Sequence, residues 1–182
     1  MEALLTEIAC AKHHIHIQYY ILNDDETGRR LRDALIAKAR EGVEVRILYD
    51  DVGSSGAKKS FFRSMRSEGI EVYAFLHVKF PLFTSKVNYR NHRKIAVIDG
   101  CVGFLGGMNI ADRYVRGTRW AHGATPISGS RAARRGLQAS FLSDWSATTK
   151  QQIAAAEYYP PRGAFHRQHH ADRLQRPLRQ MA

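Results

Sequence analysis

The chain has 182 residues, of which 44% are hydrophobic and 25% are charged, enough apolar material for one ordinary domain with a core. No apolar run approaches the ~20 residues that a membrane-spanning helix needs, and the first residues lack the pattern of a cleavable signal peptide. The net charge of +11 would suggest a polyanionic partner, but residues 1–112 hold 16 Lys/Arg against 14 Asp/Glu, whereas residues 113–182 hold 12 against 3. The nearly neutral first part argues against nucleic acid as a partner.

Helical and strand patterns alternate along the first half of the chain. Apolar residues recur at helical spacing in residues 1–13, in residues 26–41 and around Phe61, Phe62 and Met65. The segments between and after these helices read HIHIQYYIL, VEVRILYDD and IEVYAFL, as strands do. Gly42 and Gly69 suit helix ends. The alternation predicts an α/β domain with a mostly parallel, mixed sheet flanked by helices on both faces.

The second half of the chain predicts fewer elements. RKIAVIDG and CVGFLG read as a hairpin, and LQASFLSDW has the apolar pattern of a further helix. Beyond Tyr159 the sequence is basic, without pattern and poor in aliphatic residues, so we expect it to be disordered.

A set of polar residues and glycines coincides with the hairpin. His92, Lys94 and Asp99 have the spacing HxKxxxxD, and a GGxN pattern ending at Asn109 follows. Residues two apart on a strand point to the same face, so we expect His92 and Lys94 to project together and Arg93 to face away. Each residue type alone is usually solvated or structural, but six specified positions within 18 residues indicate a phosphate-handling site.

These residue types suit phosphodiester transfer. A neutral imidazole can attack phosphorus and form a phosphohistidine, so His92 is the candidate nucleophile. The Lys94 ammonium would neutralise the non-bridging oxygens, and the Asn109 amide, placed by a diglycine turn, could donate to the same oxygens as they gain charge. Asp99 lies at the far end of the strand, and we assign it a structural role in the turn. This chemistry implies no cofactor and no metal.

The motif and its flanks closely resemble bacterial cardiolipin synthases of the phospholipase D superfamily. The similarity extends to HIHIQYYI, DALIAKAREGVEVRILYDDVGS, KFPLFTSKVNYRNHRK and LQASFLSDW. Residues 1–148 thus resemble the first catalytic half of these enzymes. The resemblance implies a phospholipase D-like fold and a two-step exchange through phosphohistidine at His92. It also implies phosphatidylglycerol or another anionic phospholipid as substrate, cardiolipin and glycerol as products, and association with the bacterial cytoplasmic membrane.

The resemblance further implies a second half whose histidine protonates the leaving alkoxide, a role worth roughly 10²- to 10⁴-fold in rate. Other histidine groups, such as His13, His14 and His16, lack the motif context, and we interpret them as surface or incidental residues. We therefore expect weak or absent turnover from this half alone. One alternative is a single-motif phosphodiesterase or nuclease that completes its site as a homodimer. Another is a fragment that binds a membrane surface or a subunit through its cationic tail.

One segment departs from the family pattern. Residues 121–135 read AHGATPISGSRAARR where the family has WRDTHLRIEG, and no acidic residue lies between Asp112 and Asp144. The resemblance implies a carboxylate there that accepts from the second imidazole nitrogen and orients the ring. We therefore predict a phospholipase D-like catalytic half over residues 1–148, with an aberrant segment at 121–135, and a disordered basic tail over residues 149–182.

Frameshifts would explain this departure. Codons for His122–Ala132 can be chosen that spell WRDTHLRIEG in another frame, and codons for His170–Met181 can spell MQIVSSGPSGK, which is close to the opening of the family's second half. The nucleotide sequence of the gene tests this hypothesis, since both peptides must be present in a shifted frame.

Overall fold

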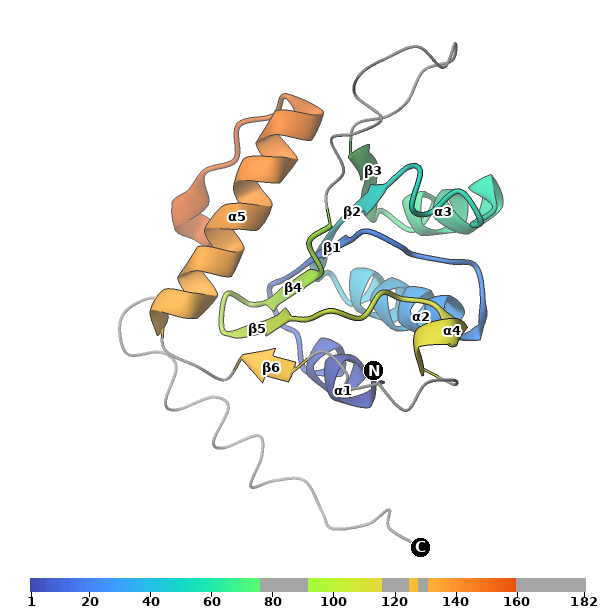
Figure 1. Cartoon of the computed structure of the whole chain (residues 1–182). Coiled ribbons are helices and arrows are strands. Elements are labelled where there is room, and N and C mark those ends of the chain that lie inside the picture. The colour runs from blue at the N-terminus through green and yellow to red at the C-terminus, as the bar shows by residue number, and fades with distance from the viewer. Residues whose placement is uncertain (76–91, 116–124, 128–130, 160–182) are drawn as a thin grey trace, which may run out of the picture.

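The protein is described here by a computed structural model, which places residues 1–75, 92–115, 125–127 and 131–159. The described chain forms one six-stranded mixed sheet with the strand order β3-β2-β1-β4-β5-β6 (Figure 1). The strands are β1 (His14–Tyr19), β2 (Glu44–Asp50), β3 (Glu71–Phe75), β4 (Ile95–Ile98), β5 (Val102–Leu105) and β6 (Thr125–Ile127). β1, β2 and β3 pair in parallel, whereas the β1–β4, β4–β5 and β5–β6 pairs are antiparallel.

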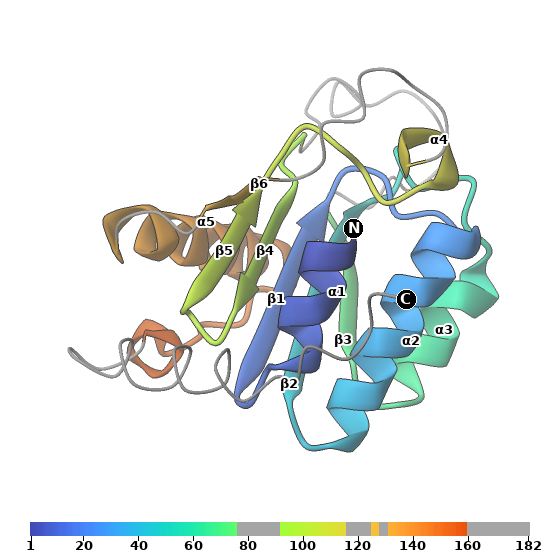
Figure 2. The ribbon, with the colours of Figure 1, turned by 90° about the horizontal axis from the view of Figure 1, so that it is seen from below.

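Helices cover both faces of the sheet. The helices are α1 (Glu2–Ala9), α2 (Glu26–Arg40), α3 (Lys59–Arg66), the short α4 (Asp112–Val115), α5 (Arg131–Thr149) and the 3₁₀ helix η2 (Ala155–Tyr158). Figures 1 and 2 show α1, α2 and α3 on one face and α5 across the other. None of the helices within the described ranges is long and apolar enough to cross a membrane.

The side chains of β1 alternate between two apolar clusters, one on each face of the sheet. Its odd-numbered side chains, including Ile15 and Ile17, pack into the large apolar cluster shared with α1, α2 and α3. Its even-numbered side chains face α5, where a smaller apolar cluster contains Phe141 and Trp145, both fully buried. β1 is therefore buried on both faces, as a central strand between two helical layers must be.

The α/β class and the flanking helices are confirmed. Parallel pairing is limited to β1–β3, and the other three strand pairs are antiparallel. β4 and β5 must be antiparallel, because a tight turn joins them and a turn of that length can connect only antiparallel strands. Asp99 and Gly100 occupy the centre of this turn with φ angles of 52° and 61°, as a type I′ hairpin turn requires. The predicted hairpin is thus confirmed.

The folded part of the described chain continues past α5 as far as Tyr159. η2 returns toward the sheet and buries Tyr158, whose hydroxyl donates to Glu44 at 3.2 Å and accepts from Arg46 at 2.6 Å. Residues 149–159 are therefore part of the folded domain. The predicted disorder of the remaining tail concerns residues 160–182, which lie outside the described residues.

The interpretation of His14 and His16 as surface residues is wrong. Both side chains are buried between β1 and α5, and His16 is fully inaccessible. Gln138 of α5 lies between them, with its Oε1 3.3 Å from His14 Nε2 and its Nε2 2.8 Å from His16 Nδ1. Their even positions on β1 place them under α5, a helix whose position the sequence did not reveal. His13 is exposed.

Candidate phosphoryl-transfer site

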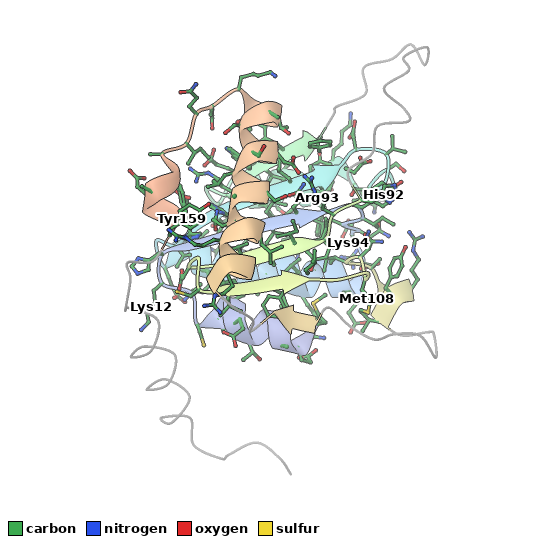
Figure 3. All side chains as sticks on the ribbon, turned by 60° about the vertical axis from the view of Figure 1, so that its left-hand side comes forward. Lys12, His92, Arg93, Lys94, Met108 and Tyr159 are labelled. Carbon is green, nitrogen blue, oxygen red and sulfur yellow. The ribbon has the colours of Figure 1, made fainter. Side chains whose placement is uncertain are left out.

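Three of the four predicted site residues, His92, Lys94 and Asn109, lie at one end of the sheet, where β1 ends and β4 begins. β4 starts at Ile95, so His92, Arg93 and Lys94 precede the strand and are not part of it. Figure 3 shows these three residues and Met108 at the end of the sheet opposite Lys12 and Tyr159. The site is therefore built on loop segments that two central strands hold in place.

His92 and Lys94 share a contact with Tyr20, the residue that follows β1. The exposed His92 ring stacks on the Tyr20 ring with centroids 4.3 Å apart and an interplanar angle of 20°. Lys94 donates from Nζ to the His92 carbonyl at 2.6 Å, and its Nζ lies 5.8 Å from the Tyr20 ring centroid. Partial burial lowers the pKa of Lys94, and the nearby Tyr114 opposes this shift. The tyrosine ring thus links the imidazole and the ammonium.

Asn109 follows β5 and lies at the same end of β1. Its buried side chain accepts at Oδ1 from the Ile21 backbone N–H at 3.1 Å. The backbones also pair, because Ile110 donates to the Ile21 carbonyl and Asn23 donates to the Ile110 carbonyl, each at 3.0 Å. With its oxygen fixed on a backbone donor, the amide has its two N–H groups as the remaining polar atoms. The side chain is thereby oriented as a donor.

Asp99 lies at the opposite end of β4 from His92. Its carboxylate accepts from the backbone N–H groups of Lys12, His13 and His14 at 3.0, 2.8 and 3.0 Å. These three bonds tie the β4–β5 turn to the start of β1. The structure therefore does not bring Asp99 together with the other three motif residues.

Besides Tyr20, the sequence analysis did not identify Asp144 and Gln18 as residues that hold the motif in place. Arg93 forms an ion pair with Asp144 of α5, whose Oδ2 also accepts from Gln18 Nε2 at 2.7 Å. Arg93 thus points to the α5 face, while its two neighbours contact Tyr20. The alternation of β1 contained a signal, because Gln18 and Tyr20 continue the even-numbered series of His14 and His16. Among the placed residues, no group of three or more His, Cys, Asp or Glu side chains could hold a metal ion.

Comparison with known sequences places the chain in a family. Residues 4–145 match the family described as cardiolipin synthase, PLD-like domain. The chain is 44% identical over 160 residues to a cardiolipin synthase 2 of Bacillus cereus, and 44% identical over 162 residues to a cardiolipin synthase of Alkalihalophilus pseudofirmus. These alignments cover 86% and 87% of this chain but 31% and 32% of the relatives. The chain therefore spans about a third of the length of the relatives that it matches.

Solved structures agree on the fold. The chain is similar to Nuc, a phospholipase D family member from Salmonella typhimurium, with a TM-score of 0.59 and 18% identity over 81% of this chain and 87% of that chain. It is also similar to a phosphatidylserine synthase of Haemophilus influenzae, with a TM-score of 0.51 and 18% identity over 65% of this chain and 28% of that chain. Because the family match extends over most of the chain, this protein belongs to the cardiolipin synthase PLD-like domain family.

Proposed function

We propose that this chain supplies the first half of a phosphatidyltransferase site of the cardiolipin synthase type. The observation that carries the proposal is the convergence of His92, Lys94 and Asn109 on the end of β1, where Tyr20 and Ile21 contact them. A nucleophile, a cation and an amide donor on neighbouring loops are the groups that phosphoryl transfer requires. The naming of the relatives as cardiolipin synthases supports an anionic phospholipid as the substrate.

The proposed reaction has two steps. An imidazole nitrogen of His92 attacks the phosphorus of phosphatidylglycerol, a P–N bond forms, and the P–O bond to glycerol breaks. A hydroxyl of a second phosphatidylglycerol then attacks the phosphohistidine and gives its proton to the acid–base histidine of a second half; the P–N bond breaks, which yields cardiolipin and restores His92. Lys94 and the Asn109 amide stabilise the non-bridging oxygens as charge accumulates in both transition states.

The leaving alkoxide of the first step needs a proton, which we assign to a histidine of a second catalytic half. No second HxK motif with the following Asp and GGxN pattern is present in the 182 residues. Activity toward phosphatidylglycerol therefore depends on a second half, and we further propose that the complete site works at a membrane surface. In the alternative, a homodimer brings two copies of His92 together and acts as a phosphodiesterase or nuclease.

A pair of substrates with different leaving groups tests the nucleophile without the missing acid. A p-nitrophenyl phosphodiester releases a stable anion that needs no protonation, whereas phosphatidylglycerol releases an alkoxide that does. We expect the chain alone to form a base-stable, acid-labile adduct on His92 with the aryl ester and little with phosphatidylglycerol vesicles. Mass spectrometry of the peptide that carries His92 measures both.

Matched variants identify the groups involved. His92→Ala should abolish the adduct and His13→Ala, a change at an exposed histidine, should leave it unchanged. Asn109→Ala should slow adduct formation by roughly 10²- to 10³-fold, the effect of removing one oxyanion donor. A reaction with both substrates whose rate per chain rises with protein concentration would favour the homodimer. Absence of any adduct on His92 at all concentrations would contradict the proposal.

A further inference from the structure

Tyr20 has no role in the chemistry described above, yet its surroundings hold it firmly. The ring is half-buried, and His92 stacks on it with the rings nearly parallel. The Tyr20 carbonyl accepts from the Ser54 hydroxyl at 3.3 Å, and the same hydroxyl accepts from the Leu22 N–H at 3.0 Å. The loop after β2 therefore fixes the backbone of Tyr20.

Gly53 in the same loop packs against Tyr20 more closely than any other residue type could. A Cβ atom at this position would lie 2.3 Å from the Tyr20 carbonyl oxygen and 3.0 Å from the ring atoms Cδ2 and Cε2. The first distance is to backbone, which cannot move aside as a flexible side chain does. The glycine is thus required by close approach, and it leaves the tyrosine ring little freedom on that side.

We propose that Tyr20 is a positioning residue that holds the His92 imidazole in the orientation needed for attack on phosphorus. Stacking engages the face of the imidazole, whereas the nitrogen lone pairs lie in the ring plane and stay available to an electrophile. Restricting the ring to the reactive orientation lowers the entropy cost of the attack. Lys94, within 6 Å of the Tyr20 ring centroid, is held next to the imidazole by the same ring.

This role fits a chain with no acidic residue between Asp112 and Asp144. A carboxylate orients an imidazole by accepting from one of its nitrogens, whereas a stacked ring orients it without occupying either nitrogen. The inference rests on the proposed function for the identity of His92 as nucleophile. The contact between the rings can nevertheless be tested without any turnover.

Three variants separate stacking from the hydroxyl group. Tyr20→Phe keeps the ring, Tyr20→Leu removes it, and Gly53→Ala displaces it. Ring-current shifts of the His92 proton signals in NMR report the stack, and the rate of carbethoxylation by diethyl pyrocarbonate reports the freedom of the ring. We expect Tyr20→Phe to match the wild type. In Tyr20→Leu and Gly53→Ala, the upfield shifts should decrease. Diethyl pyrocarbonate arrives from solution and is not bound in one orientation, so an imidazole released from the stack meets it from more directions, and the carbethoxylation rate should rise about two- to tenfold, as the loss of one aromatic pair implies.

Two histidines serve as internal references. Exposed His13 gives the rate of an unconstrained imidazole, and fully buried His16 becomes reactive only if the fold is lost. Results are therefore scored as the ratio of His92 to His13 in samples in which His16 stays protected. If a variant unfolds, the ring-current shifts in Tyr20→Phe and the wild type still decide whether the rings stack. An unchanged ratio and unchanged shifts in Tyr20→Leu would overturn the proposal, whatever the outcome of the adduct experiment.

Discussion

Acidification should destabilise the domain through the two histidines buried under α5. Burial lowers the pKa of His14 from its ordinary value of 6.5 to about 4, and the neighbouring His16 adds to this shift. The charges of Asp99 and Glu44 and a hydrogen bond to Gln138 partly oppose it. Burial also lowers the pKa of His16. Between about pH 6.5 and about pH 4 the unfolded chain binds more protons than the folded one, so stability falls as the pH falls.

The pKa shift of His14 determines how much stability is lost on acidification. At ~1.36 kcal/mol per pKa unit, the change from 6.5 to about 4 corresponds to about 3 kcal/mol lost below pH 4, of which about 2.5 kcal/mol is lost by pH 4.5. His16 acts in the same direction, so the whole protein should lose more than this. Domains of this size have stabilities of roughly 5–15 kcal/mol, and the loss is a large part of that.

Urea unfolding at about pH 7.5 and about pH 4.5 measures this loss. His14→Gln removes the titrating ring but keeps a hydrogen-bonding amide near Gln138, so its acid-induced loss should be smaller than that of the wild type by about 2.5 kcal/mol. His13→Gln, at an exposed position, is the matched control and should behave as the wild type. Equal losses in His14→Gln and the wild type would refute the argument from burial.

Substitutions at two carboxylates, Asp99 and Asp144, test how much each contributes to stability. Asp99→Ala leaves three backbone N–H groups without their acceptor and should cost about 2 kcal/mol of stability, whereas Asp99→Asn, which keeps an acceptor and tolerates the positive φ, should cost less; equal losses in a urea titration would contradict this. Asp144→Asn breaks the partly exposed ion pair with Arg93 and should cost under about 1 kcal/mol, with faster hydrogen exchange at residues 92–94. Unchanged exchange there would show that the ion pair does not anchor the motif.

The hydrophobic pattern was sufficient to predict the first half of the fold. Stripes such as Leu31 and Leu35 in α2, and the alternation of Ile15 and Ile17 in β1, reflect burial against neighbours close in sequence. The antiparallel placement of β4 beside β1 was not predictable from those patterns, because it depends on pairing between strands about 80 residues apart. Where a tight turn specified its own geometry, as at Asp99, the local sequence was again sufficient.

The motif identified the candidate site residues but not the residues that hold them in position. Tyr20 and Asp144 are separated from His92 by more than 50 residues in opposite directions. Tyr20 follows β1 and Asp144 belongs to α5, and the local pattern of each segment concerns only its own packing. They meet because β4 pairs with β1 while α5 crosses both strands (Figure 3). Residue spacing within one segment carries information on chemistry, whereas the contacts that orient that chemistry depend on sheet order.

Sheet order also explains why the segment before α5 matters to His92. Thr125, the first residue of β6, pairs with Leu105, and Leu105 pairs with Ile95, the first residue of β4. The beginning of β6 is therefore at the same end of the sheet as His92, in the segment for which the resemblance to cardiolipin synthases predicts an acidic residue. Here the strand reads Thr-Pro-Ile, and a proline is tolerated because β6 is the last strand of the described sheet. This strand thus keeps its backbone pairing with β5 without a carboxylate in its sequence, and the orientation of His92 that we propose, by stacking on Tyr20, requires none.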